Sequence, residues 1–167
     1  MDVSEWNFLA RVILATLLGA AIGLERELRA KEAGLRTHML VALGAAMFMV
    51  TGFLLIEEFV AASQAVDASG VDALRLDGLS FSGNIITGIG FLGGAIIFRN
   101  ESRARGVTTA ASIWATTAVG LACAAGQYIL AVGATITVLF ILYAVGLLEA
   151  RFSLRIDDEE EPRSGRN

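Results

Sequence analysis

Long apolar runs alternate along the chain with short charged segments. A helix of roughly 20 residues spans the hydrocarbon core of a bilayer, with a lower limit near 17. Five runs reach this length, so the pattern predicts an all-α, polytopic membrane protein with five transmembrane helices. The predicted spans are Phe8–Leu24, Thr37–Ile56, Ser82–Phe98, Thr108–Ala125 and Tyr128–Leu148.

The composition agrees with this pattern. The 167 residues are 55% hydrophobic and 18% charged, and the mean hydropathy is +0.64. A soluble domain of this size cannot bury that much apolar surface, which excludes the soluble globular class. We therefore expect one transmembrane domain over residues 1–150. Residues 151–167 are charged, contain the only proline, and are predicted to form a disordered cytoplasmic tail.

Lysine and arginine predict the orientation. Eleven of the thirteen lie in three segments on one side of the predicted spans, namely 25–36, 99–106 and the residues from 149 onward. The opposite side has Arg75, and Arg11 lies inside the first span, where we expect its side chain to snorkel to the surface. Because basic loops stay in the cytoplasm, the sequence predicts an N-out, C-in topology.

The two charged segments 25–36 and 99–106 share a sequence pattern. Each precedes a returning helix with a Gly-x-x-Thr step, Gly34–Thr37 in one case and Gly106–Thr109 in the other, 72 residues apart. The match indicates a parallel repeat of two helical hairpins, although shared turn chemistry explains it equally well. We expect the threonine of each step to cap the free N–H groups of the next helix.

The charged segments hold the candidate functional residues. The preference of basic residues for the cytoplasmic side does not account for an acidic residue beside the end of a span. Glu25 is therefore expected to pair with Arg36 or Arg105. A specific polar network and simple anchoring both remain open, and anchoring accounts for Lys31 and Arg103. The candidate network and partner surface consists of Glu25, Arg26, Glu27, Arg36, Thr37, His38, Arg99, Arg105, Thr108 and Thr109.

Other chemistry-bearing residues are scarce. The single histidine, His38, is interpreted as a capping or surface residue at a span entrance, with pH sensing as the alternative. One cysteine, Cys123, excludes an internal disulfide and a cysteine-based metal cluster. No Walker loop, His-Glu-x-x-His helix or Ser–His–acid set occurs, so no enzyme, cofactor or metal site is predicted.

Small residues recur at four-residue spacing in several spans. Such stripes allow helices to approach closely in lipid, and we interpret them as packing within the bundle rather than as a dimer seam or a pore lining. Trp114 is expected to pack against a glycine surface. The predicted packing residues are Gly19, Gly23, Gly88, Gly90, Gly93, Gly94, Ser112, Trp114 and Gly120.

Several blocks of the sequence resemble the MgtC/SapB family of bacterial membrane proteins. They occur in order over most of the chain, and they are Gly23–Glu27, Ala33–Val41, Gly88–Arg99, Arg105–Trp114 and Gly120–Ala122. The resemblance implies an inner-membrane protein associated with growth at low magnesium and with the virulence of intracellular pathogens. Some members bind and restrain the membrane ATP synthase, whereas direct magnesium transport is the less favoured role.

Certain family members also carry a C-terminal cytosolic domain that resembles ACT-type folds. Too few residues follow Leu148 for such a domain, so we expect a short member without it. The predicted function is a non-enzymatic regulator in magnesium limitation or acid stress. It would bind another membrane protein such as the ATP synthase, and it would form a homo-oligomer, preferably a dimer, without nucleic acid. The alternative is a small ion or lipid channel, or a magnesium carrier, with a pathway beside a broken, glycine-rich third helix.

Overall fold

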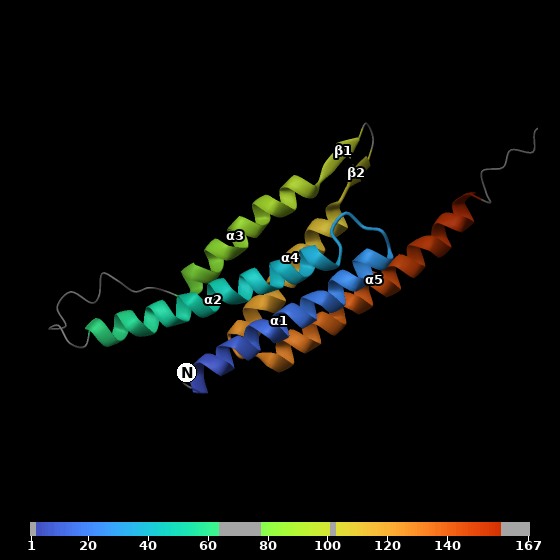
Figure 1. Cartoon of the computed structure of the whole chain (residues 1–167). Coiled ribbons are helices and arrows are strands. Elements are labelled where there is room, and N and C mark those ends of the chain that lie inside the picture. The colour runs from blue at the N-terminus through green and yellow to red at the C-terminus, as the bar shows by residue number, and fades with distance from the viewer. Residues whose placement is uncertain (1–2, 64–77, 101–102, 158–167) are drawn as a thin grey trace, which may run out of the picture.

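The computed structural model describes residues 3–63, 78–100 and 103–157. Five helices and one short hairpin make up this part of the chain (Figure 1), and their bounds are α1 (Val3–Leu28), α2 (Leu35–Ser63), α3 (Gly78–Ile96), β1 (Phe98–Asn100), β2 (Arg103–Arg105), α4 (Val107–Ala124) and α5 (Tyr128–Asp157). The predicted five-helix architecture is confirmed. Four helices are long and apolar enough to cross a membrane, and the apolar part found in α3, Gly83–Ile96, is shorter.

The helices extend beyond the apolar runs that predict them. The charged residues after the first run continue α1 to Leu28, because Glu, Arg and Leu are good helix formers. At the other end of the chain, α5 continues to Asp157, although the sequence predicts a disordered tail from residue 151. No glycine or proline interrupts the stretch 147–161. Residues 158–167 of the predicted tail lie outside the described part.

The expectation of a broken third helix is wrong. α3 runs without interruption from Gly78 to Ile96 despite its five glycines after the first residue. Each glycine disfavours a helix by about 1 kcal/mol relative to alanine. In lipid, however, a backbone group without a hydrogen bond costs several kcal/mol, so the unbroken helix is the better solution. The helix therefore keeps its carbonyl groups in its own hydrogen bonds.

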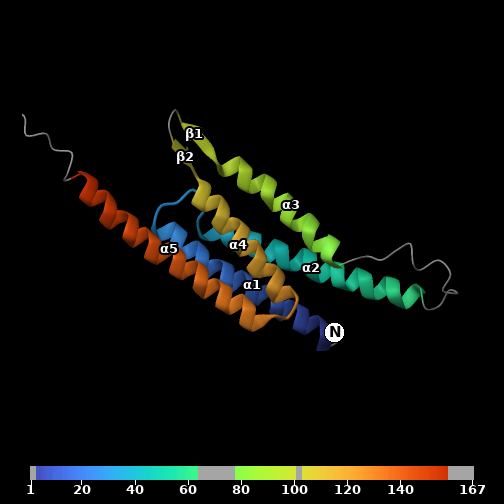
Figure 2. The same ribbon diagram turned by 180° about the vertical axis from the view of Figure 1, so that it is seen from behind.

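The helices run back and forth as one bundle. α1 and α2 form an antiparallel pair, α4 packs against both, and α5 lies along α1 and α4 (Figures 1 and 2). α3 lies at the edge of the bundle next to α4 and α2. The core is built mainly from small side chains, which lets the helices approach closely, and its fully buried members include Ala15, Ile22, Ala42, Ala46, Val119, Cys123, Ala124 and Ala131.

Three glycines make the close contacts in this core possible. A Cβ atom added to Gly19 would lie 2.7 Å from the Cβ of Ala42, and one added to Gly120 would lie 2.7 Å from the carbonyl oxygen of Ala42. A Cβ on Gly23 would lie 2.8 Å from the Cα of Leu35. These distances are too short for any side chain. These close contacts fall at three of the predicted packing positions, on α1 and α4.

The packing predicted for Trp114 and for three of the four glycines on α3 is wrong. A Cβ on Gly88, Gly90 or Gly94 would meet nothing within 4 Å in the described part of the chain. Gly93 does face α4, where its added Cβ would lie 3.6 Å from that of Ala110. Trp114 is 51% exposed. It lies two residues from the buried positions 112 and 116, which places it on the opposite side of α4 from the core.

The segment 99–106, expected as a loop, contains a two-stranded antiparallel hairpin. Phe98 pairs with Arg105 and Asn100 pairs with Arg103. Gly106 then turns the chain into α4 with φ of +81°, and a Cβ there would collide with the carbonyl oxygen of Ile96. Only glycine fits this turn.

Both charged segments lie at one end of the bundle, together with the C-terminal part of α5, while the N-terminus lies at the opposite end (Figure 1). We call the end formed by residues 25–36 and 103–109 the charged end. The N-out orientation and the parallel repeat stay predictions.

Candidate functional site

A pair of arginines surrounds one carboxylate at the end of α1. Glu25 Oε2 lies 2.5 Å from Arg26 Nε, and Glu25 Oε1 lies 2.6 Å from Arg29 Nε. The second contact is an ion pair without hydrogen-bond alignment, and this buried oxygen accepts no hydrogen bond from the described residues. Arg26 is only 2% exposed. The expected pairing of Glu25 with Arg36 or Arg105 is wrong, because Arg29, four residues along the same helix, already lies beside the carboxylate.

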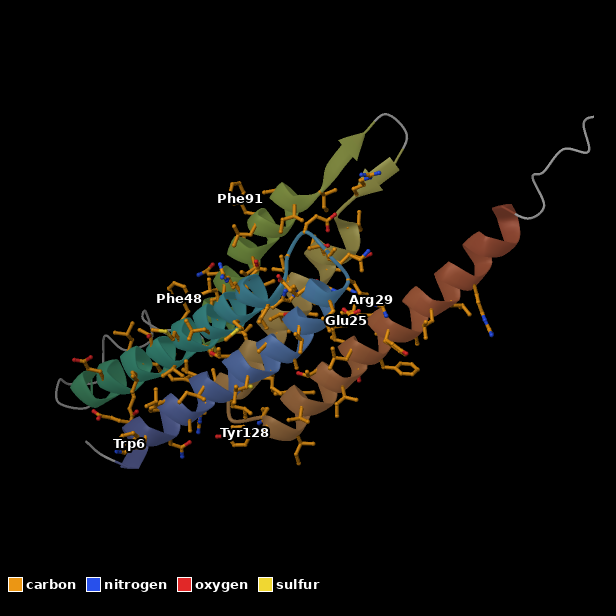
Figure 3. The ribbon with its side chains drawn as sticks, turned by 45° about the vertical axis from the view of Figure 1, so that its right-hand side comes forward. Trp6, Glu25, Arg29, Phe48, Phe91 and Tyr128 are labelled. Atoms are coloured by element: carbon orange, nitrogen blue, oxygen red, sulfur yellow. The ribbon has the colours of Figure 1, made fainter. Side chains whose placement is uncertain are left out.

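Arg29 also joins α1 to α5. Its guanidinium carbon lies 5.5 Å from the ring centroid of Tyr143, and the guanidinium rests against Gly146. Figure 3 shows Glu25 and Arg29 near each other at the end of α1 beside α5. Cations bind favourably to aromatic faces at such distances. The sequence analysis missed Arg29, although its four-residue spacing from Glu25 is the usual spacing of helical ion pairs.

His38 connects α2 to α4 in the interior of the bundle. Its side chain is fully buried, which corrects the expectation of a capping or surface residue. Nδ1 lies 2.9 Å from the carbonyl oxygen of Gly34, and Nε2 lies 3.1 Å from Ser112 Oγ. A carbonyl can only accept, so Nδ1 carries a proton. Ser112 Oγ is also 2.8 Å from the carbonyl oxygen of Thr109, which gives its hydroxyl proton two alternative acceptors when the imidazole is neutral.

Two further acids form specific hydrogen bonds at the charged end. Glu27 Oε2 accepts the backbone N–H of Leu35 at 3.0 Å and so caps the start of α2. Thr109 donates its hydroxyl to Glu32 Oε2 at 2.6 Å. This bond lowers the pKa of the Glu32 carboxyl, and the nearby positive charges act in the same direction. Glu32 is a second residue that sequence reasoning missed, since the bond joins segments 77 positions apart.

The prediction that threonines cap the returning helices is wrong. α2 begins at Leu35 and α4 at Val107, each two residues before the threonine in question. Thr37 is therefore already inside its helix, and α4 begins without a side-chain cap. The helices start earlier because Glu27 supplies one cap and the left-handed Gly106 provides the turn into the other helix.

The remaining candidate residues do not join these contacts. Arg36, Arg105 and Thr108 are exposed at the charged end. The side chain of Arg99 lies outside the described part of the structure. The site thus consists of a group of interior contacts, made by the ion pairs of Glu25, by Arg29 and by His38, that connects α1, α2, α4 and α5. Exposed polar side chains surround this group. Within residues 3–63, 78–100 and 103–157, no three His, Cys, Asp or Glu side chains gather into a metal site.

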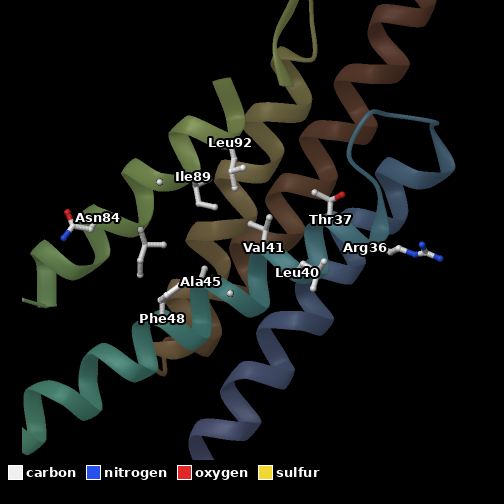
Figure 4. Close-up of a pocket in the computed structure, with 12 residues that line it drawn as sticks. Arg36, Thr37, Leu40, Val41, Ala45, Phe48, Asn84, Ile89 and Leu92 are labelled. Carbon is white, nitrogen blue, oxygen red and sulfur yellow. The ribbon is translucent and has the colours of Figure 1, made fainter. Parts of the chain in front are cut away.

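A cleft separates α3 from α2. It has a volume of about 810 Å³ and is lined mostly by apolar side chains. Figure 4 shows Val41 and Phe48 of α2 facing Ile89 and Leu92 of α3, while Arg36 points away from α3. Gly44 and Gly88 also line it, and a Cβ on either would meet nothing within 4 Å. The cleft therefore follows the apolar parts of two helices.

Arg11, at the opposite end of the bundle from the charged end, makes specific contacts in addition to the expected snorkelling to the surface. Its Nη1 donates to the carbonyl oxygen of Ala124 at 2.8 Å, and its guanidinium lies 5.3 Å from the ring centroid of Phe8. It thereby binds one of the free carbonyl groups at the C-terminus of α4. We assign it to the structure of the bundle.

Comparison with known proteins identifies the family. Residues 12–151 match the sequence model of the MgtC family. The chain is 38% identical over 137 residues to YhiD of Escherichia coli K12, which is named as a candidate magnesium transporter, and 37% identical over 132 residues to MgtC of Salmonella typhimurium 14028s. These matches cover 81% and 79% of the chain.

The chain spans 59% of the length of YhiD and 49% of the length of MgtC. A protein of Synechocystis named as uncharacterized, slr0014, is 35% identical over 125 residues. No solved structure matches. The family match and the apolar helices together show that this chain belongs to the MgtC family of multi-pass bacterial membrane proteins.

Proposed function

We propose that this chain is a non-enzymatic membrane regulator that acts in magnesium limitation or acid stress by binding another membrane protein. The cleft between α2 and α3 is the observation that supports this function most strongly. Its walls are apolar, and Gly44 and Gly88 leave open space on it. Transmembrane helices associate by close packing on small residues, so the cleft suits a helix of a partner.

The charged end supplies a second surface for such a partner. The contact of Arg29 with Tyr143 and the hydrogen bond between His38 and Ser112 hold the helices relative to one another, and Arg36, Arg105 and Thr108 remain exposed. A charged end whose helices are already held in place loses little conformational entropy when its exposed polar groups bind a partner. The family resemblance proposes the ATP synthase as the partner, and the name of YhiD supports the link to magnesium.

Growth at low magnesium tests this function. Gly44→Leu and Gly88→Leu place side chains in the cleft at positions where an added Cβ meets nothing within 4 Å. We expect normal protein levels and a loss of growth support. Gly133→Leu is the matched control, because Gly133 lies on α5 with equally open space. If both cleft variants supported growth as well as the control does, the cleft would not be the binding surface.

The charged end is tested in the same assay by Glu25→Ala and Arg105→Ala. We expect both variants to reduce growth support when compared at matched protein levels, since Glu25→Ala also leaves the buried Arg26 without its carboxylate partner. Unchanged growth would show that the charged end is not needed for the function, and the cleft would then remain as the candidate surface for the partner.

A carrier for an ion or a lipid, including magnesium, is the second candidate function. The name of YhiD favours it, and so does the cleft beside the glycine-rich α3. Purified protein in proteoliposomes would then carry magnesium or lipid across the bilayer, and Gly88→Leu in the cleft would abolish this flux. Absence of flux from protein that restores growth would exclude the carrier and support the regulator.

A further inference from the structure

A second cavity, of about 500 Å³, lies at the charged end between the end of α1, the start of α4 and the middle of α5. Its walls differ in character. α5 contributes apolar side chains such as Leu142 and Val145, whereas α1, the following loop and β2 contribute charges. Four of the charged lining residues are basic and one is acidic, and they are Arg26, Arg29, Lys31, Arg105 and Glu32.

Positive charge exceeds negative charge around this cavity. Glu25 is the carboxylate nearest to Arg26, and it is shared with Arg29. Glu32 offsets one further charge. Among the described residues around this cavity, four basic side chains face two carboxylates. Arg26 is paired with Glu25, so the excess positive charge lies on the more exposed Lys31 and Arg105, and an anion in this cavity would reduce the repulsion between the basic groups.

The start of α4 adds backbone donors to the same wall. The first hydrogen bond within α4 runs from Ala110 N–H to the carbonyl oxygen of Gly106 at 2.8 Å. The N–H groups of residues 107–109 precede it, and no side chain caps them. Free N–H groups and the positive end of an 18-residue helix favour oxyanions.

We propose that this cavity binds a phosphate-bearing anion, either a phospholipid headgroup or inorganic phosphate. Guanidinium groups match the geometry of phosphate oxygens, and the lysine adds a point charge. Basic pockets between transmembrane helices commonly bind lipid headgroups, and the apolar wall of α5 would continue along an acyl chain. This site is separate from the cleft between α2 and α3. It shares Arg105 and Thr108 with the exposed surface of the charged end, to which it adds a ligand that the proposed function does not include.

Calorimetric titration of the full chain in neutral detergent micelles tests the site. The probes are inorganic phosphate, dihexanoyl phosphatidylglycerol and, as a zwitterionic reference, dihexanoyl phosphatidylcholine. Lys31→Gln combined with Arg105→Gln removes two cavity charges, and both side chains are exposed, so the fold is retained. Each basic residue near an anionic lipid contributes about 1 kcal/mol, so affinity should fall roughly thirtyfold.

Arg36→Gln combined with Arg151→Gln is the matched control. It removes the same charge from exposed positions outside the cavity lining, and binding should weaken by less than about threefold. Binding of phosphatidylglycerol alone identifies a lipid headgroup, and binding of inorganic phosphate as well identifies a free anion. The proposal is overturned if neither probe binds more tightly than phosphatidylcholine, or if the control pair weakens binding as much as the cavity pair.

Discussion

Each charged or polar side chain buried at the charged end has an identifiable partner. Arg26 lies against Glu25, and His38 lies between Gly34 and Ser112. The ion pair joins neighbours on one helix, whereas the histidine joins two helices. Loss of one partner from a buried pair leaves the other unsatisfied, which costs more than the bond itself contributes.

The bond between His38 and Ser112 can be tested by removing one hydroxyl. We expect Ser112→Ala to lower the free energy of unfolding by about 1–3 kcal/mol, because Nε2 of the buried imidazole loses its partner. Reversible unfolding in mixed detergent micelles measures this. Thr137→Val removes an exposed hydroxyl that bonds only to its own helix, and it should cost less than about 0.5 kcal/mol. Equal losses in the two variants would contradict the assigned role of His38.

Glu32 makes stability depend on pH. Its carboxyl pKa is lowered in the folded chain, so its stabilising effect is complete above the ordinary pKa and is lost as the pH falls through the lowered value. Wild-type protein should therefore melt at a higher temperature than Glu32→Gln at pH 7, and the two should converge in strong acid. Thr109→Val should remove most of the difference. A difference that stays constant over the whole pH range would contradict the assignment.

Some residue-level features could be predicted from the sequence and others could not. The position of Glu25 beside a span end predicts an ion pair, and the four-residue spacing would have supplied Arg29 as its partner. The burial of His38 depends on Gly23 of another helix, since a Cβ there would lie 2.9 Å from the Cβ of His38. No local pattern contains that information.

Helix packing in this bundle depends on which glycines face a neighbour. The stripes on α1 and α4 point into the core, but those on α3 mostly do not. Spacing along one helix predicts a stripe of small residues, and only the arrangement of the other helices determines what covers it. For the same reason, the apolar pattern predicted all five helices but not their ends. The cap from Glu27 determines where α2 begins, and the turn at Gly106 determines where α4 begins.

Alanine substitution separates buried from open glycines. Gly120→Ala places a methyl group 2.7 Å from the backbone oxygen of Ala42, and we expect a loss of about 1–3 kcal/mol in the free energy of unfolding. Gly133→Ala meets nothing within 4 Å and should be neutral or stabilising by up to about 1 kcal/mol. The same unfolding assay measures both. A neutral Gly120→Ala would show that α2 and α4 are not held as closely as described.

The whole molecule has an apolar cleft beside α3 and a basic cavity at the charged end. α1, α2 and α4 pack tightly around small residues, and α3 lies apart from α2 across the cleft. The cleft beside α3 leaves room for a partner helix, while the tight packing of α1, α2 and α4 holds the rest of the bundle in place. The class of the fold follows from the apolar pattern, whereas the cleft could not be predicted because it arises from the angle between two helices.

Site-specific photocrosslinking in living cells tests partner binding most directly. A photoreactive phenylalanine analogue at Phe48 places the probe in the cleft, and the same group at Ile129, which is 92% exposed on α5, is the control. The account predicts one defined crosslinked species from Phe48 in magnesium-limited cells, identified by mass spectrometry as another membrane protein, and none from Ile129. The same products from both positions, or only a second copy of this chain at Phe48, would contradict it.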